Sequence, residues 1–238
     1  MKIGIAETHR PLATLSLALA MALASLPGTA AAQVTVFLPT EGDLKATLAL
    51  PGDVQRGKDA YAECQTCHRT DASGRIAFNI PRLSGQHASV IIKQLMDIRS
   101  GLRVNEDMRE YMHDSDLTLQ DFADMAAYLQ SLPVAGRIGQ GPPELVPRGQ
   151  ALYASDCAGC HGEHGEGRAE LFFPMLASQH YGYLLRELEL IVNGQRGNSN
   201  PAMPPILKNY STDDKQALAA YLAQLPAPGK GVTPETPK

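Results

Sequence analysis

Two short clusters of cysteine and histidine have the spacing of a cofactor attachment site. Each reads Cys-x-x-Cys-His, and together they use all four cysteines of the 238-residue chain. Two thiols three positions apart near a helix end can each add to one vinyl group of a haem, and the adjacent histidine then reaches the iron. The sequence therefore predicts two covalently bound haem c groups. The predicted attachment residues are Cys64, Cys67, Cys157 and Cys160, and the predicted iron ligands beside them are His68 and His161.

Two other kinds of cysteine chemistry compete with this interpretation. Disulfides form in the oxidising compartments that exported chains enter, and zinc would need four ligands at each site. Neither explains why a histidine directly follows the second cysteine of each cluster. The repeated pattern therefore favours haem over both.

The second axial ligand of each iron separates an electron carrier from a site that binds substrate, because an iron with both axial positions filled has none open. Methionine is the usual second ligand in such domains, and it raises the potential relative to two histidines. For the second haem we predict Met203, in the segment Asn200-Pro-Ala-Met-Pro-Pro205. We expect the prolines to keep this segment out of a helix, so that it can lay the thioether over the haem face.

The ligand of the first haem is less clearly marked. The position 93 residues before Met203 is Glu110, which Met108 and Met112 flank, and the prolines are missing. We predict Met108, which lies in the expected turn before the last helix of its unit, with Met112 as the alternative. His113 is a third possibility that would lower the potential of this haem.

These residues belong to one unit that occurs twice. A shift of 93 residues places residues 64–133 on residues 157–226 without a gap. Besides the haem motifs, the two segments share Pro-x-Leu, Gln-His, Gly-x-Arg and Ala-Ala-Tyr-Leu stretches at matching positions. A repeat of this kind predicts two copies of one fold, each of about 80 residues.

Each unit is predicted to hold three main helices around its haem and no strand, so the fold class is all-α with two tandem domains. Apolar residues recur at helical spacing, and Ser/Thr-x-x-Asp signals mark the last helix. The histidine of each Gln-His pair is expected to cap a helix or to face solvent. The predicted starts in the two units are Asp53 and Pro147 for the first helix, His87 and His180 for the second, and Thr118 and Ser211 for the third.

Two pairs of repeat-equivalent residues are expected to support the haems. Arg103 and Arg196 are predicted to pair with haem propionates, for which a guanidinium fork is suited. Pro81 and Pro174 are predicted to turn the chain so that a carbonyl accepts the Nδ1 proton of the motif histidine. Such a bond fixes the imidazole that faces the iron.

The segments outside the repeats have their own composition. The chain begins with basic residues, an apolar stretch and Ala30-Ala31-Ala32, which predicts an export signal cleaved near Ala32. Gly and Pro are frequent between the units and Pro in the tail. The predicted divisions are a signal peptide at 1–32, an extended N-terminal arm at 33–51, domain 1 at 52–133, a linker at 134–146, domain 2 at 147–227 and a disordered tail at 228–238.

The charge of the chain limits the class of partner. The formal net charge is −4, and removing residues 1–32 takes away Lys2, Arg10 and Glu7 and leaves −5. An acidic protein is not expected to bind nucleic acid but can dock on a basic patch of a redox protein. No stretch after the signal is long and apolar enough to cross a membrane. We therefore expect a soluble periplasmic protein.

The doubled Cys-x-x-Cys-His, the Gly-x-Arg before a methionine and the Ala-Ala-Tyr-Leu of each last helix resemble the class I dihaem cytochromes c of the cytochrome c4 group. The resemblance covers residues 52–227. It implies two cytochrome c domains related by a pseudo-twofold axis, His/Met ligation at both irons, and electron transfer towards a terminal oxidase or another acceptor. The proline-free segment around Met108 and Met112 departs from the pattern.

We therefore expect an electron carrier between a redox protein donor and a redox protein acceptor, with a membrane oxidase complex as a candidate acceptor. One alternative is a haem subunit that serves a dedicated dehydrogenase. Another is a dihaem enzyme, such as a peroxidase or a thiosulfate-oxidising protein, which needs one open iron. The methionine candidates at both haems weigh against the enzyme.

Overall fold

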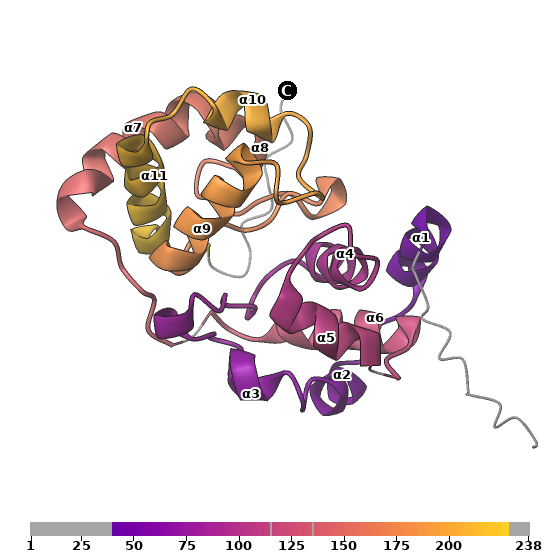
Figure 1. The fold of residues 1–238 in the computed structure, drawn as a ribbon. Coiled ribbons are helices and arrows are strands. Elements are labelled where there is room, and N and C mark those ends of the chain that lie inside the picture. The colour runs from indigo at the N-terminus through magenta and orange to yellow at the C-terminus, as the bar shows by residue number, and fades with distance from the viewer. Residues whose placement is uncertain (1–39, 115, 135, 229–238) are drawn as a thin grey trace, which may run out of the picture. The chain divides into compact units, whose positions relative to one another are not determined.

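The computed structural model describes residues 40–114, 116–134 and 136–228 (Figure 1). The predicted signal peptide, the start of the predicted arm and most of the predicted tail lie outside these residues. Within the described ranges the chain forms helices joined by irregular segments, and its extended pairings are two isolated bridges, Arg75 with Ile80 and Arg168 with Phe173. The predicted all-α fold is confirmed. None of the described helices is long and apolar enough to cross a membrane.

The same succession of helices occurs in both repeats. In the first repeat the elements are α1 (Glu41–Ala49), α2 (Val54–Ala60), α3 (Gln65–His68), η1 (Ile76–Phe78), α4 (Ala88–Arg99), α5 (Glu106–Asp114) and α6 (Leu119–Ser131). In the second they are η2 (Pro143–Leu145), α7 (Val146–Asp156), α8 (Ala158–His161), η3 (Ala169–Leu171), α9 (Tyr181–Val192), α10 (Met203–Leu207) and α11 (Thr212–Gln224). From α2 to α6, each element of the first repeat therefore has a counterpart between α7 and α11.

In each repeat the helix before the haem motif crosses the last helix at a glycine. Gly57 of α2 lies so close to α6 that a Cβ atom there would be 1.9 Å from the carbonyl oxygen of Asp124. Gly149 of α7 lies in the same way on α11, where a Cβ atom would be 2.0 Å from the carbonyl oxygen of Ala217. Only a residue without a side chain permits this backbone approach, which brings the start and the end of each domain together.

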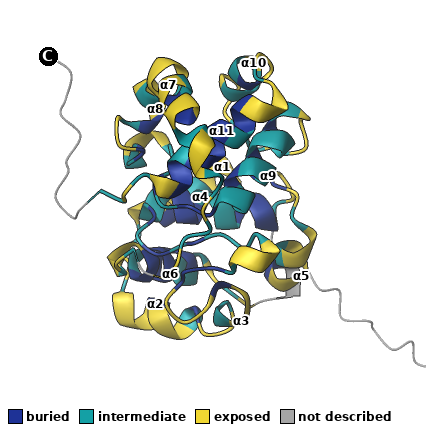
Figure 2. Cartoon of the chain, turned by 90° about the vertical axis from the view of Figure 1, so that its left-hand side faces the viewer, coloured by how far each residue is buried: buried dark blue, intermediate teal, exposed yellow. Residues whose placement is uncertain are grey.

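Each domain has its own hydrophobic core. Figure 2 shows the buried residues concentrated on α4 and α6 in the first domain and on α11 in the second. A pair of tyrosines recurs in both cores: Tyr61 packs on Tyr128 with ring centroids 5.6 Å apart, and Tyr153 packs on Tyr221 at 5.5 Å. The repeat in sequence is therefore also a repeat in packing.

The predicted capping signals of the last helices are confirmed. The side-chain oxygens of Thr118 and Ser211 accept hydrogen bonds from the backbone N–H groups of Asp121 and Asp214, at 3.2 and 3.1 Å. Each aspartate also accepts a bond from the N–H of its capping residue. This exchange closes a capping box at the start of α6 and of α11.

The expected extended arm is wrong for residues 41–49, which form α1. Thr40 and Asp43 make a capping box that starts the helix, and the Asp43 N–H lies 3.2 Å from the Thr40 hydroxyl. The helix packs against α4 and α6 and buries Thr47. Its apolar residues show little periodicity, so only the cap pointed to a helix.

The segments that carry the candidate methionine ligands are also helical, which corrects two predictions. Met108 lies inside α5 and not in a turn, because the Asn105 side chain accepts a hydrogen bond from the Met108 N–H at 3.2 Å and caps the helix. Met203 begins α10 although two prolines follow it. Pro204 and Pro205 occupy the first turn, where a helix needs no N–H donors.

The linker between the repeats packs on the second domain. The Tyr181 N–H donates to the carbonyl of Gly139 at 2.8 Å, and the Gly139 N–H donates to Nδ1 of His180 at 3.1 Å. Gln140 adds a bond to the carbonyl of Ala223 at 3.3 Å. The predicted linker is thus tied to the start of α9 and the end of α11.

Candidate haem sites

The two motif histidines end α3 and α8, and both side chains are buried. Nδ1 of His68 lies 3.1 Å from the carbonyl oxygen of Pro81, and Nδ1 of His161 lies 3.4 Å from that of Pro174. The predicted role of these two prolines is confirmed. Because a carbonyl only accepts, Nδ1 carries the proton and Nε2 keeps its lone pair for a metal.

The electrostatics of these sites favour the neutral imidazole. Burial lowers the pKa of His68 and of His161, although the proline carbonyls act in the opposite direction. Both rings are therefore neutral at pH 7, which is the form that binds iron. At His161 the nearby Arg196 lowers the pKa further.

A tyrosine fixes the residue after each motif histidine, and the sequence reasoning missed it. The chain turns there with a positive φ, 68° at Arg69 and 84° at Gly162. The Tyr61 hydroxyl donates to the carbonyl of Arg69 at 3.0 Å, and the Tyr153 hydroxyl donates to the carbonyl of Gly162 at 2.6 Å. Each tyrosine precedes its motif by a few residues, and this near-repeat was the available signal.

The cysteines fit thioether attachment better than zinc binding. Cys67 and Cys160 are exposed, whereas Cys64 and Cys157 are half-buried, and no disulfide joins the four. Burial raises the pKa of Cys64 and of Cys157 to about 11. Among the described residues, no three His, Cys, Asp or Glu side chains gather as a metal-ligand set. Each motif thus offers two thiols and one imidazole, the groups that haem c uses.

The candidate methionines lie on the helices that follow the Gly-x-Arg segments. Met108 and Met112 are one turn apart on α5, which packs on α4. Met112 is only 5% exposed within the first core, and Met108 is half-buried against that core. Met203 is half-buried at the start of α10, which packs on α9. The side chain of His113 lies outside the described part of the structure, and the iron-binding roles of the methionines remain predictions.

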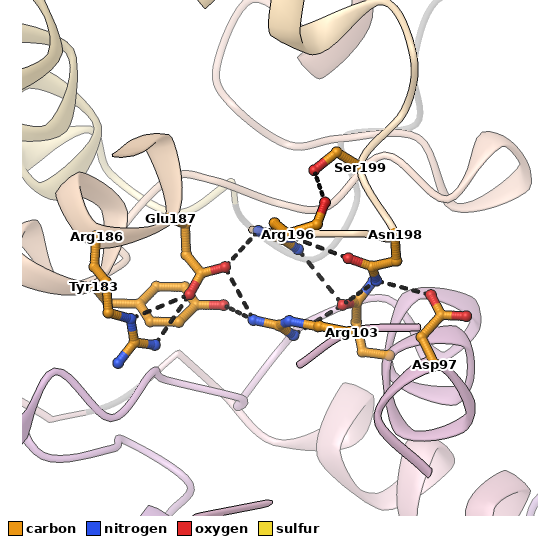
Figure 3. Close-up of polar contacts among 9 residues, drawn as sticks. Asp97, Arg103, Tyr183, Arg186, Glu187, Arg196, Asn198 and Ser199 are labelled. Carbon is orange, nitrogen blue, oxygen red and sulfur yellow. Dashed lines mark hydrogen bonds and ion pairs between the residues drawn. The ribbon is translucent and has the colours of Figure 1, made fainter. Parts of the chain in front are cut away.

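The two repeat-equivalent arginines meet in a polar cluster between the repeats (Figure 3). Arg103 Nη2 lies 3.1 Å and Arg196 Nη1 2.7 Å from Oε2 of Glu187 on α9. Gln94 of α4, the repeat equivalent of Glu187, accepts a hydrogen bond from Arg103 at 2.8 Å. A cavity of about 180 Å³ opens beside both arginines. Their predicted pairing with haem propionates stays a prediction; Arg103 is buried and Arg196 is half-buried.

Glu187 is ionised although it is buried. Burial opposes its ionisation, but attraction to Arg103, Arg196 and Arg186 is stronger in sum and lowers the pKa of the carboxyl group. The hydroxyl of Tyr183 also contacts Arg103, at 3.0 Å. This cluster therefore places a fixed charge between the two haem domains.

The expectation that His87 and His180 cap helices or face solvent is wrong. Neither side chain caps its helix. Nε2 of His87 lies 2.7 Å from the carbonyl oxygen of Glu166, and Nε2 of His180 lies 2.8 Å from that of Ser73. Each histidine thus contacts the other repeat, and His180 is only 1% exposed.

Comparison with known proteins supports the same interpretation. The family model of cytochrome c matches residues 54–133 and 146–226, one match for each repeat. The chain is 33% identical over 184 residues to cytochrome c4 of Pseudomonas aeruginosa, and the match covers 73% of this chain and 89% of that protein. The chain belongs to the cytochrome c4 group. As a member of this group it carries two covalently bound haem c groups and transfers electrons.

Two further comparisons are consistent with membership of the cytochrome c4 group. The crystal structure of reduced recombinant cytochrome c4 from Pseudomonas stutzeri matches with a TM-score of 0.66 and 30% identity, over 73% of this chain and 99% of that one. A thiosulfate dehydrogenase electron acceptor of Stutzerimonas stutzeri is 30% identical over 210 residues, which covers 80% of this chain and 96% of that protein. The predicted tandem cytochrome c domains are therefore confirmed.

Proposed function

We propose that this protein is a periplasmic dihaem carrier that passes electrons between a redox protein donor and an acceptor, with a terminal oxidase as the acceptor. Each haem, when bound, supplies a one-electron redox couple. The observation that supports the proposal is that each repeat combines a buried histidine, whose Nδ1 faces a carbonyl, with a methionine-bearing helix. A site with both axial positions filled suits electron transfer rather than substrate binding.

We assign the side chains of each site as follows. Cys64 and Cys67 hold the first haem through thioether bonds and His68 ligates its iron, while Met108, with Met112 as the alternative, supplies the second axial ligand. Cys157, Cys160, His161 and Met203 take these roles at the second haem. The proline carbonyls that face Nδ1 orient both imidazoles and raise their basicity.

Export and charge support the proposed location and partners. The export signal in residues 1–32 would deliver the chain to the compartment where haem c is attached, and the acidic mature chain would dock on basic surfaces of its partners. A dehydrogenase as a dedicated donor is the second candidate function. It is favoured by the similarity to the protein named as an acceptor for thiosulfate dehydrogenase. In both cases this chain carries electrons.

The near-infrared spectrum of the oxidised holoprotein tests the assignment, because a methionine bound to ferric haem gives a weak charge-transfer band. We expect intensity for two sites, half of it lost in Met203→Leu and half in either Met108→Leu or Met112→Leu. Leucine is used because it nearly conserves side-chain volume. Met175→Leu is the matched control in the second repeat and should keep the full intensity. Intensity for one site only would contradict the two-site carrier and favour a dihaem enzyme with one open iron.

A further inference from the structure

Each repeat holds the backbone of the other with a glutamine. Gln86 accepts a hydrogen bond from the N–H of Met175 at 2.9 Å and donates one to the carbonyl of the same residue at 3.0 Å. Gln179, the repeat equivalent of Gln86, accepts from the N–H of Arg82 at 2.9 Å and donates to its carbonyl at 2.9 Å. The two contacts are reciprocal, since Arg82 and Met175 are also equivalent positions.

A single peptide group connects Gln86 to His161, the predicted iron ligand of the second domain. The N–H of Met175 and the carbonyl of Pro174 belong to a single peptide group. That carbonyl faces Nδ1 of His161 at 3.4 Å, while the N–H donates to Oε1 of Gln86. A continuous hydrogen-bonded chain therefore runs from a side chain of the first domain to the imidazole in the second.

An equivalent series of hydrogen bonds runs from a side chain of the second domain to the imidazole in the first. The N–H of Arg82 shares its peptide group with the carbonyl of Pro81, which lies 3.1 Å from Nδ1 of His68. Gln179 of the second domain accepts from that N–H. Each haem ligand is thus connected through one peptide group to a glutamine of the other domain.

The histidine next to each glutamine contacts a second part of the same loop. His87 contacts the carbonyl of Glu166. The N–H of the next residue, Gly167, donates to the carbonyl of His161 at 2.8 Å. His180 reaches the carbonyl of Ser73 in the equivalent way, and Gly74 donates to the carbonyl of His68 at 3.0 Å. The Gln-His pair of one domain therefore contacts both ends of the loop that follows the motif histidine of the other domain.

We propose that Gln86 and Gln179 are positioning residues that tune the haem of the opposite domain. The inference rests on the proposed ligation of iron by His68 and His161. A peptide whose N–H donates becomes more polarised, so its carbonyl is a stronger acceptor. A stronger bond to Nδ1 makes the imidazole a more basic ligand, which favours oxidised iron and lowers the reduction potential.

Burial makes the glutamines hard to replace by water. Gln86 is 8% exposed and Gln179 is 5% exposed. When either amide is removed, its peptide N–H loses its acceptor and the polarisation of the carbonyl falls. The imidazole hydrogen bond then weakens, and the potential of the haem in the other domain rises.

The test is a redox titration of the holoprotein in which NMR signals of the haem methyl groups distinguish the two haems. We expect Gln86→Leu to raise the potential of the haem ligated by His161 and to shift the other haem less. Gln179→Leu should raise the potential of the haem ligated by His68. The crossed pattern is the signature, because a residue that acts within its own domain would produce the opposite assignment.

The control variant breaks a contact between the repeats that involves neither of the peptide groups facing Nδ1. Ser89→Ala removes the bond from the Ser89 hydroxyl to the carbonyl of Ala169, 2.6 Å long. This control should leave both potentials close to those of the wild type. If Ser89→Ala and Gln86→Leu shift the potentials alike, the cause is a looser interface and the proposal is wrong.

A second measurement reads the imidazole directly. In reduced Gln86→Leu, the Nδ1 proton of His161 should have a chemical shift typical of a weaker hydrogen bond. It should also exchange faster with solvent than in the wild type. Gln86→Asn, which keeps the amide but shortens its reach, should act in the same direction if the leucine variant folds poorly. Unchanged potentials and an unchanged Nδ1 proton would overturn this proposal. The proposed electron carrier would survive that result as long as the near-infrared bands of both haems remained.

Discussion

Glu187 and Gln94 occupy equivalent positions in the two repeats, and this difference sets the charge between Arg103 and Arg196. A carboxylate at both positions would balance the two guanidinium groups, but Gln94 is neutral and accepts from Arg103 at 2.8 Å. Arg103 and Arg196 therefore share one carboxylate, that of Glu187, which Arg186 also contacts. We predict that a haem propionate adds a further negative charge beside these guanidinium groups.

We predict that Glu187→Gln lowers the free energy of unfolding of the holoprotein by roughly 3 kcal/mol at pH 7, because buried guanidinium groups lose their carboxylate. The folded pKa of Glu187 is lower than its unfolded value of about 4.3. Its ionised form therefore contributes stability above that unfolded value, and the contribution is lost as pH falls through the folded pKa. Urea unfolding in a pH series measures this effect. The difference in free energy of unfolding between wild type and variant should become smaller below about pH 5.

The control for this prediction is Glu106→Gln. Glu106 forms an exposed ion pair with Arg109 at 2.9 Å, and its side chain is 71% exposed. Exposed pairs of this kind contribute less than about 1 kcal/mol. A gap between wild type and Glu187→Gln that stayed constant with pH would show that the carboxylate charge is not the cause.

At the scale of helices, the crossing of α2 with α6 and of α7 with α11 organises each domain. Both α2 and α7 end just before a haem motif, and the last helix follows the methionine-bearing helix. The crossing therefore closes the chain around the haem site from both ends. The contact is between backbones, since the glycines at the crossing leave no room for a side chain.

We predict that Gly57→Ala and Gly149→Ala each destabilise the holoprotein by about 3 kcal/mol, the upper range of overpacking costs. In both cases the new methyl group would meet a backbone carbonyl at 1.9 or 2.0 Å, and a backbone cannot rotate away as a side chain can. Thermal unfolding followed at the haem absorbance measures the loss. Gly42→Ala in α1 is the control, because its nearest neighbour would be 3.5 Å away. Equal melting temperatures for all three variants would contradict the crossing argument.

The sequence predicted features that depend on neighbouring residues, but not those that depend on how the two repeats pack on each other. The haem motifs, the repeat and the capping boxes of Thr118 and Ser211 are short-range patterns and were predicted. The helix around Met203 was missed because prolines in a first turn and prolines in a loop look alike in sequence. The contacts of Gln86 and Gln179 arise only when two repeats meet. Their single sequence signal was a polar pair present in both halves.

At the scale of the whole described chain, the two domains share a buried polar boundary. The guanidinium group of Arg82 donates to the carbonyls of Ala177 and Ser178 in the second repeat at 2.9 and 2.8 Å, and also to Ser84 in its own repeat. Burial lowers the pKa of Arg82 to about 10, which still leaves it charged at pH 7. A domain of about 80 residues buries a limited core, so these contacts add to the stability of both. The two haem domains are thus expected to unfold together.

We predict that the wild-type holoprotein unfolds in one transition and that Arg82→Met separates it into two. Methionine is the residue that the second repeat holds at the equivalent position, so packing volume is largely kept while three carbonyls lose their donor, two of them across the boundary. Calorimetry provides the measurement, because equal calorimetric and van't Hoff enthalpies indicate a single cooperative unit. Arg109→Ala, which removes only an exposed ion pair, should keep one transition. If Arg82→Met also unfolds in one transition, the polar boundary does not hold the domains together, and cooperativity must come from the haems or from the linker that packs on the second domain.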